Sequence, residues 1–134
     1  MPSGHPSFAE PLPVDCPPED AAPLFKGAMI RLAKQATPTA ADFLSYKALG
    51  GANVGGVCPC IYSACSMFQH DNDDEQIRAM QKLPKFRRFR YAYVISVDAN
   101  SGLGLEGQNK HVSVWLYSTF NPLSYVLEVK PFHG

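Results

Sequence analysis

The C-terminal part of the chain contains three segments with the composition of β-strands. FRYAYVISVD is rich in aromatic and β-branched residues and is followed by the turn-like sequence ANSGLG. HVSVWLYS and SYVLEVKPF have the same strand character. Segments of this kind pack as neighbours in a sheet, so they constrain the fold more than any other feature. We predict strands over residues 88–98, 111–117 and 124–130.

The first part of the chain adds further strand and helix segments. GAMIRLAK is short and apolar and fits a strand better than an uncapped helix. TPTAADFLSYKALGG has threonine at a capping position, proline near its first turn and paired glycines at its end. DNDDEQIRAMQKLP begins with acidic residues and has Lys82 near its end, as the helix dipole favours, and Pro84 lies beyond it. We predict strands over 27–34 and 60–68, and helices over 38–48 and 72–82.

This order of elements predicts one α+β domain over residues 27–134. Two strands that alternate with two short helices, followed by three strands, favour a mostly antiparallel sheet, either continuous or split. A chain of 134 residues with 46% apolar content can bury one core. The predicted core residues are Ile30, Leu32, Phe43, Ile61, Met67, Ile77, Met80, Val94, Val114, Leu116 and Val126.

Residues 1–26 have the composition of an extended arm. Seven prolines fall within them and no periodic pattern survives between the prolines. The arm has no positive start followed by an apolar core of signal-peptide length, and the apolar runs elsewhere are too short to cross a bilayer. We therefore expect a cytoplasmic protein without a membrane partner.

The charge balance argues against a dedicated nucleic-acid protein. Twelve Lys and Arg residues balance twelve Asp and Glu residues, so no general field attracts polyanions. KFRRFR, residues 85–90, is a local exception that can meet phosphates or stack on bases. Alternating charged and apolar residues at a strand entry also protect a sheet edge, and this is the favoured interpretation. Lys85, Arg87 and Arg88 are expected to stay in solvent.

CPCIYSACSMFQH, residues 58–70, concentrates cysteines in one short stretch. If the chain loops back there, Cys58, Cys60, Cys65 and His70 can converge on a metal ion. Their spacing differs from the paired Cys-x2-4-Cys turns of structural zinc sites, so we predict no metal and an interior strand preceded by a loop.

The cytoplasmic expectation also applies to the cysteines. A reducing compartment keeps thiols free unless metal or catalysis recruits them. We therefore expect no disulfide framework among Cys16, Cys58, Cys60 and Cys65.

Arg31, Ser66 and Glu128 lie on an early, a central and the last predicted strand. Enzymes that split the nicotinamide–ribose bond of NAD need a cation for the pyrophosphate, a hydroxyl-bearing strand and a carboxylate near the oxocarbenium-like centre. In this order the chain resembles the ADP-ribosyltransferase-type split-sheet fold, which implies an NAD-consuming enzyme with these three catalytic residues. The chain has Ser63-Ala64-Cys65-Ser66 where one group of that family has Ser-Thr-Ser, and Val126 two positions before the glutamate.

A second resemblance rests on four short segments. TPTAADF, the segment from Cys60 to Phe68 that ends in SMF, LPKF and HVSVW follow one another in an order that is similar to small uncharacterised bacterial proteins. That resemblance implies neither a fold nor an activity.

The binding candidates come from the predicted strands. His111 and Trp115 are four positions apart, so they share one strand face and can line a cleft together, with Tyr62 as a further candidate. No strong catalytic motif is present. We therefore predict a small cytoplasmic binding or regulatory protein that acts on a partner protein, with the NAD-consuming enzyme as the alternative.

Overall fold

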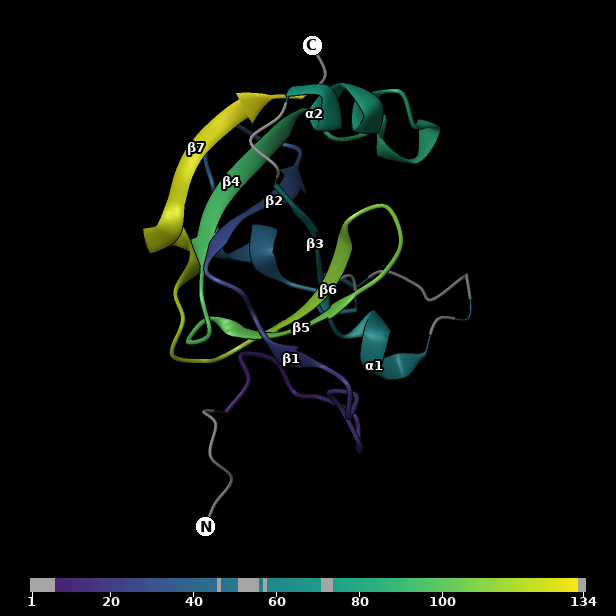
Figure 1. The fold of residues 1–134 in the computed structure, drawn as a ribbon, viewed down its shortest axis with the longest axis vertical. Helices are drawn as coiled ribbons and strands as arrows, with labels where there is room; N and C mark the ends of the chain where they lie inside the picture. Colours follow the sequence, from purple (N-terminus) through teal and green to yellow (C-terminus); the bar gives the residue numbers. More distant parts are fainter. Residues whose placement is uncertain (1–6, 46, 51–55, 57, 71–73, 133–134) are drawn as a thin grey trace.

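The computed structural model describes residues 7–45, 47–50, 56, 58–70 and 74–132. In these residues the chain forms one strongly curved sheet in which all neighbouring strands are antiparallel (Figure 1). The strands are β1 (Ala22–Pro23), β2 (Gly27–Ala33), β3 (Cys65–Gln69), β4 (Tyr91–Val97), β5 (Gly102–Glu106), β6 (His111–Leu116) and β7 (Val126–Pro131). Their order across the sheet is β1-β5-β6-β3-β2-β4-β7. The predicted single α+β domain is confirmed, and its sheet is continuous.

The helices are short and lie outside the sheet. They are α1 (Pro59–Tyr62), α2 (Asp74–Gln81) and the 3-10 helices η1 (Ala40–Phe43), η2 (Pro84–Phe86) and η3 (Pro122–Tyr125). The predicted helix over 72–82 corresponds to α2, with residues 72 and 73 outside the described residues.

The helix predicted over residues 38–48 is longer than the helix in the structure, which is η1 (Ala40–Phe43). It begins as expected, because Thr39 N–H donates to the Asp42 carboxylate at 2.7 Å, but Leu44 is already extended. The carbonyls of Asp42 and Leu44 accept hydrogen bonds from the Arg31 guanidinium, at 2.6 and 3.2 Å. A long-range partner thus takes carbonyls that a continuing helix needs for its own ladder.

The strand predicted over 60–68 is wrong in its first half. Residues 59–62 form α1, which starts with Pro59 at its first position, where a missing N–H costs nothing. Ser63 closes the turn, since its hydroxyl donates to the Pro59 carbonyl at 2.9 Å. The strand begins only at Cys65, and it ends at Gln69.

Two strands lie where the sequence predicts none. β1 belongs to the predicted arm and pairs with β5, which falls partly within the predicted turn ANSGLG. Gly104 of β5 permits this pairing, because a Cβ there would lie 2.6 Å from Leu24 Cδ2. Close approach of a neighbouring side chain, rather than a turn, explains that glycine.

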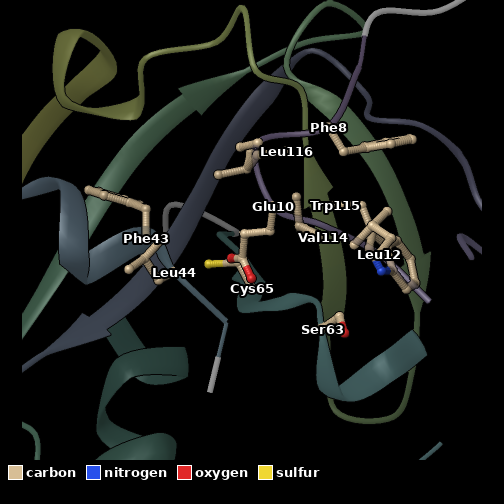
Figure 2. Close-up of a pocket in the computed structure, with 11 residues that line it drawn as sticks. Phe8, Glu10, Leu12, Phe43, Leu44, Ser63, Cys65, Val114, Trp115 and Leu116 are labelled. Carbon is tan, nitrogen blue, oxygen red and sulfur yellow. The ribbon is translucent and has the colours of Figure 1, made fainter. Parts of the chain in front are cut away.

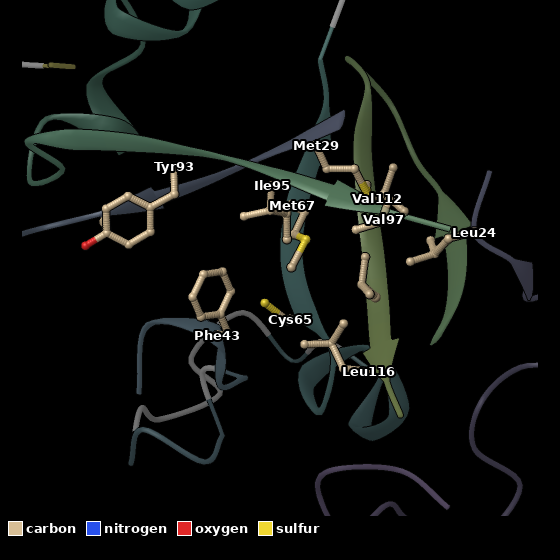
Figure 3. Close-up of a cluster of buried hydrophobic side chains, with 12 residues drawn as sticks. Leu24, Met29, Phe43, Cys65, Met67, Tyr93, Ile95, Val97, Val112 and Leu116 are labelled. Carbon is tan, nitrogen blue, oxygen red and sulfur yellow. The ribbon is translucent and has the colours of Figure 1, made fainter. Parts of the chain in front are cut away.

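The two faces of the sheet bury separate clusters. The inner face carries Leu24, Met29, Ala33, Phe43, Cys65, Met67, Tyr93, Ile95, Val97, Val112, Val114 and Leu116 (Figure 3). The outer face carries Ile30, Leu32, Phe68, Ile77, Met80, Ala92 and Phe132, and α2 supplies two of them. All predicted core residues are buried except Ile61 and Val126, which are half-buried. Lys85, Arg87 and Arg88 are exposed, as predicted.

The described part of the N-terminal segment packs against one end of the sheet. Phe8 forms an antiparallel bridge with Tyr117, and Ala9 N–H donates to the Leu116 carbonyl at 2.9 Å. Cys16 and Cys60 form a disulfide with their Cα atoms 5.3 Å apart. The expectation of free thiols throughout is therefore wrong. Residues 44 positions apart become neighbours when the segment folds back over α1, and a spacing pattern does not reveal such a contact.

Candidate functional site

Arg31 fixes the backbone of its neighbours. Besides the two carbonyls that end η1, its Nη1 donates to the carbonyl of Ser66 at 2.8 Å. Three backbone acceptors therefore hold the guanidinium on the inner face, next to Phe43 and Cys65. Charge-assisted hydrogen bonds of this kind stabilise the junction of β2, β3 and η1.

Ser66 and His111 meet on the outer face of the sheet. Residues of β3 and β6 pair in antiparallel register, and alternation places both side chains on the face opposite Cys65 and Met67. Ser66 Oγ lies 2.5 Å from His111 Nε2. The serine is exposed and the histidine is half-buried. The sequence predicted both residues as site residues, but in separate roles.

The surroundings of His111 keep its imidazole neutral. Burial lowers the pKa of His111, and the positive charge of Lys85 lowers it further. The ring stands edge-on to Phe68 at 5.3 Å between centroids, and Phe68 in turn stands edge-on to Phe86 at 5.5 Å. A neutral ring has one nitrogen that accepts a hydrogen bond, and Ser66 is placed to donate to it.

Glu128 lies away from this pair. It is exposed on β7 and stands opposite Val94 of β4, next to an irregularity in the pairing. β2 and β4 separate β7 from β3, which is about 14 Å along the sheet at a strand spacing of about 4.8 Å. The structure thus does not bring together Arg31, Ser66 and Glu128, and the NAD-consuming activity stays a prediction.

Trp115 lies under the N-terminal segment. Trp115 is 2% exposed and donates from Nε1 to the Cys60 carbonyl at 3.1 Å. Phe8 and Leu12 pack against the same cluster. Tyr62 is half-buried at the end of α1. The segment therefore covers the strand face that Trp115 shares with His111, while His111 remains accessible at the other end of the strand.

The four cysteines have three different states. Cys16 and Cys60 are joined, Cys58 is exposed as a free thiol and Cys65 is buried as a free thiol. Burial raises the pKa of Cys65, the charge of Arg31 opposes that shift, and Glu10 adds to it. Among the described residues no group of three or more His, Cys, Asp or Glu side chains is placed to hold a metal ion.

A small cavity lies between Cys65 and the N-terminal segment (Figure 2). Its volume is about 30 Å³, which is room for about one water molecule. The Glu10 side chain enters it, and its carboxylate accepts from the backbone N–H of Ser45 at 2.8 Å and from the Ser45 hydroxyl at 2.6 Å. The cavity is too small for an organic ligand.

A much larger cleft opens at the opposite end of the inner face. Its volume is about 680 Å³, within the range of about 300–1,000 Å³ that is usual for ligand pockets. Leu24, Met29 and Val112 give it an apolar floor that is continuous with the core. Phe25 stands at its edge and is 83% exposed.

Polar groups surround this floor. Asp20, Lys26 and Glu106 bring charges to the cleft, and Gln69 Nε2 donates to the Glu106 carboxylate across it. His70 also lines the cleft, and within the described residues its buried Nδ1 has no hydrogen-bond partner. An apolar floor with a few polar groups above it is typical of a binding site.

The sequence does not predict this cleft, because two of its walls come from β5 and from the segment between β1 and β2. By composition, those residues are typical of a turn and of an extended arm. The alternation in GLGLE is the one sequence signal for β5, and its two glycines mask the signal.

No family model, curated protein or solved structure matches the chain. The geometry alone therefore carries the functional argument. In the described part of the chain, no helix has the length and apolar character that crossing a bilayer requires.

Proposed function

We propose that the protein is a binding protein that takes a segment of a partner protein into the cleft lined by Leu24, Phe25, Met29, Glu106 and Val112. The cleft is the observation that carries this proposal. It combines a ligand-sized volume with a floor that is already formed by the folded core. A preformed site binds without first ordering its own residues.

Phe25 favours a protein as the occupant. An aromatic ring that is 83% exposed beside a cleft gains a large apolar contact when a partner covers it. Aromatic side chains next to a pocket are typical anchors of protein interfaces. A molecule small enough to sink fully into the cleft would leave most of this ring in water.

The charges around the cleft suggest the partner's sequence. Asp20 and Glu106 are acidic, and Lys26 is the one basic residue among those that line it, apart from His70. A segment with an apolar residue flanked by Lys or Arg would fill the floor and meet the two carboxylates. Charge complementarity of this kind supplies specificity and on-rate.

A displayed library of random peptides tests the proposal on purified protein. Peptides with an apolar residue next to Lys or Arg should be enriched, and a synthetic copy should bind in calorimetry. Phe25→Ala and Glu106→Lys should each weaken binding at least tenfold. Val14→Ala is the matched control, because Val14 is 89% exposed on the N-terminal segment, away from the cleft, and its variant should bind normally.

Two outcomes of these experiments would overturn a protein partner in this cleft. Peptide binding that Phe25→Ala and Glu106→Lys leave unchanged would place the peptide elsewhere and overturn the proposal. A small molecule that native mass spectrometry finds on purified protein, and that Glu106→Lys displaces, would overturn the protein partner in favour of a small ligand.

The disulfide is relevant to the compartment in which the protein functions. A cytoplasm would keep Cys16 and Cys60 reduced, whereas they are bonded here. We therefore propose a compartment in which this bond persists, in place of the cytoplasm. Alkylation of intact producing cells before lysis tests this, since modification of both thiols would restore the cytoplasmic prediction.

A further inference from the structure

We propose that Ser66 and His111 form a nucleophile and base pair that hydrolyses esters whose acyl group carries a negative charge. The site lies on the outer face of the sheet, whereas the cleft opens on the inner face. The inference is therefore independent of the proposed function.

The first support is the position of the nucleophile. Ser66 Oγ is 2.5 Å from His111 Nε2 and the serine is exposed, so an ester carbonyl can reach the oxygen while the base holds its proton. Both residues sit on paired central strands, where the backbone fixes their relation. Sites built on strands hold their geometry better than sites on loops.

The second support is the state of the base. A general base must be unprotonated, and burial together with the Lys85 charge keeps His111 in that state at neutral pH. Phe68 packs edge-on against the ring and restricts its rotation. The imidazole is thus both available and oriented.

The third support is the charge beside the pair. Lys85 lies over the Phe86 ring at 5.2 Å, and Arg88 lies over the Phe89 ring at 4.8 Å. Lys85 lies close enough to lower the pKa of His111, and the exposed Arg87 and Arg88 follow it in sequence, so this segment carries positive charge that attracts an anionic acyl group.

The reaction balances without a cofactor. Ser66 Oγ bonds to the ester carbonyl carbon while its proton passes to His111 Nε2. The bond to the alcohol oxygen then breaks, and the alcohol takes that proton. Water attacks the resulting acyl-serine and gives its proton to Nε2, the acid leaves, and the proton returns to Ser66 Oγ. Ester and water become acid and alcohol.

Two p-nitrophenyl esters test the proposal on the full chain. The hemisuccinate ester, with an anionic acyl group, should turn over at least tenfold faster than the neutral acetate ester. Ser66→Ala should remove the protein-dependent turnover of both. Ser96→Ala, a half-buried serine on β4, which β2 separates from β3, should leave it unchanged. A fluorophosphonate probe should label the peptide that contains Ser66.

The role of the base is tested separately. His111→Gln keeps a hydrogen-bonding group beside Ser66 and should lose turnover at least 100-fold while the protein still melts cooperatively. In the parent, kcat/KM should rise with pH through an apparent pKa below 6.5, the ordinary value for histidine. Lys85→Gln should move that value upward and reduce the preference for the hemisuccinate. A purely structural hydrogen bond would produce neither change.

Each other outcome overturns the inference. Absence of probe on Ser66, or turnover that survives Ser66→Ala, would show that the serine is not a nucleophile. Equal rates for the two esters would overturn the assigned substrate class. None of these results depends on peptide binding in the cleft, so the two proposals fail separately.

Discussion

Glu10 holds Ser45 across 35 positions of sequence, through one hydrogen bond from the backbone N–H and one from the hydroxyl. Ser45 is 0% exposed, so its backbone N–H and its hydroxyl both lose a buried partner when this carboxylate is removed. We expect Glu10→Ala to lower the free energy of unfolding by about 2–4 kcal/mol, the range for leaving two buried donors unsatisfied. Urea denaturation measures the loss. Glu19→Ala, an exposed position on the same segment, should stay within about 0.5 kcal/mol of the parent.

Arg31→Met should destabilise the protein by about 3 kcal/mol, because three backbone carbonyls lose a charged donor together. Thermal unfolding provides the measurement, with Arg78→Met on the exposed side of α2 as the control. An Arg31→Met protein with parental stability would contradict the structural role described here and would return Arg31 to the list of ligand-binding candidates.

Removal of the disulfide should cost about 4 kcal/mol, the chain-entropy value for a cross-link that closes a loop of 44 residues. The double variant Cys16→Ser, Cys60→Ala gives the cleanest comparison with the parent in urea. Cys58→Ser serves as the control, since that thiol is exposed and unbonded. If the double variant unfolds at the same urea concentration as the parent, the bond contributes nothing to stability.

The two free thiols should label at very different rates. Cys58 is exposed, whereas Cys65 is 2% exposed and burial raises its pKa, so little of its reactive thiolate exists near neutral pH. With iodoacetamide on the native protein, we expect Cys58 to be modified first and Cys65 only after unfolding. Mass spectrometry of the digested protein distinguishes the two sites. Early modification of Cys65 would mean that the inner face is open to solvent.

His111 should make stability depend on pH on the acidic side. Its pKa is lowered in the folded protein, so below about pH 6.5 the unfolded chain binds more protons than the folded one. Stability should therefore fall as pH drops through that value and should be fully present above it. Lys85→Gln should weaken this dependence, because it removes one of the two causes of the shift. Titration of the His111 ring protons by NMR checks the direction of both effects.

The sequence predicts the strands that carry continuous apolar or aromatic alternation. β2, β4, β6 and β7 appear within a few residues of their predicted limits, since β-branched and aromatic side chains signal a half-buried pleated surface. α2 is predicted for a different reason: acidic residues at its start match the helix dipole, and Pro84 beyond its end cannot continue the helix.

The errors arise where distant residues decide local structure. η1 stops early because Arg31, which lies on β2, donates hydrogen bonds to the carbonyls of Asp42 and Leu44. β5 forms because it pairs along its length with β6, and β1 forms because the N-terminal segment pairs back onto β5, although glycine and proline argue against strands there. The Ser66–His111 contact and the Cys16–Cys60 bond join residues 45 and 44 positions apart, and neither has a local pattern.

The position of Trp115 also makes it an intrinsic fluorescence probe of the N-terminal segment. The protein has a single tryptophan, and that ring is enclosed by Cys60, by Cys16 of the disulfide and by Phe8 and Leu12 of the N-terminal segment. Its emission therefore comes from one place, beneath the segment and next to the sulfur bridge. A shift of that emission to longer wavelength, at a denaturant concentration below the main unfolding transition, would report that the segment lifts off while the sheet stays folded.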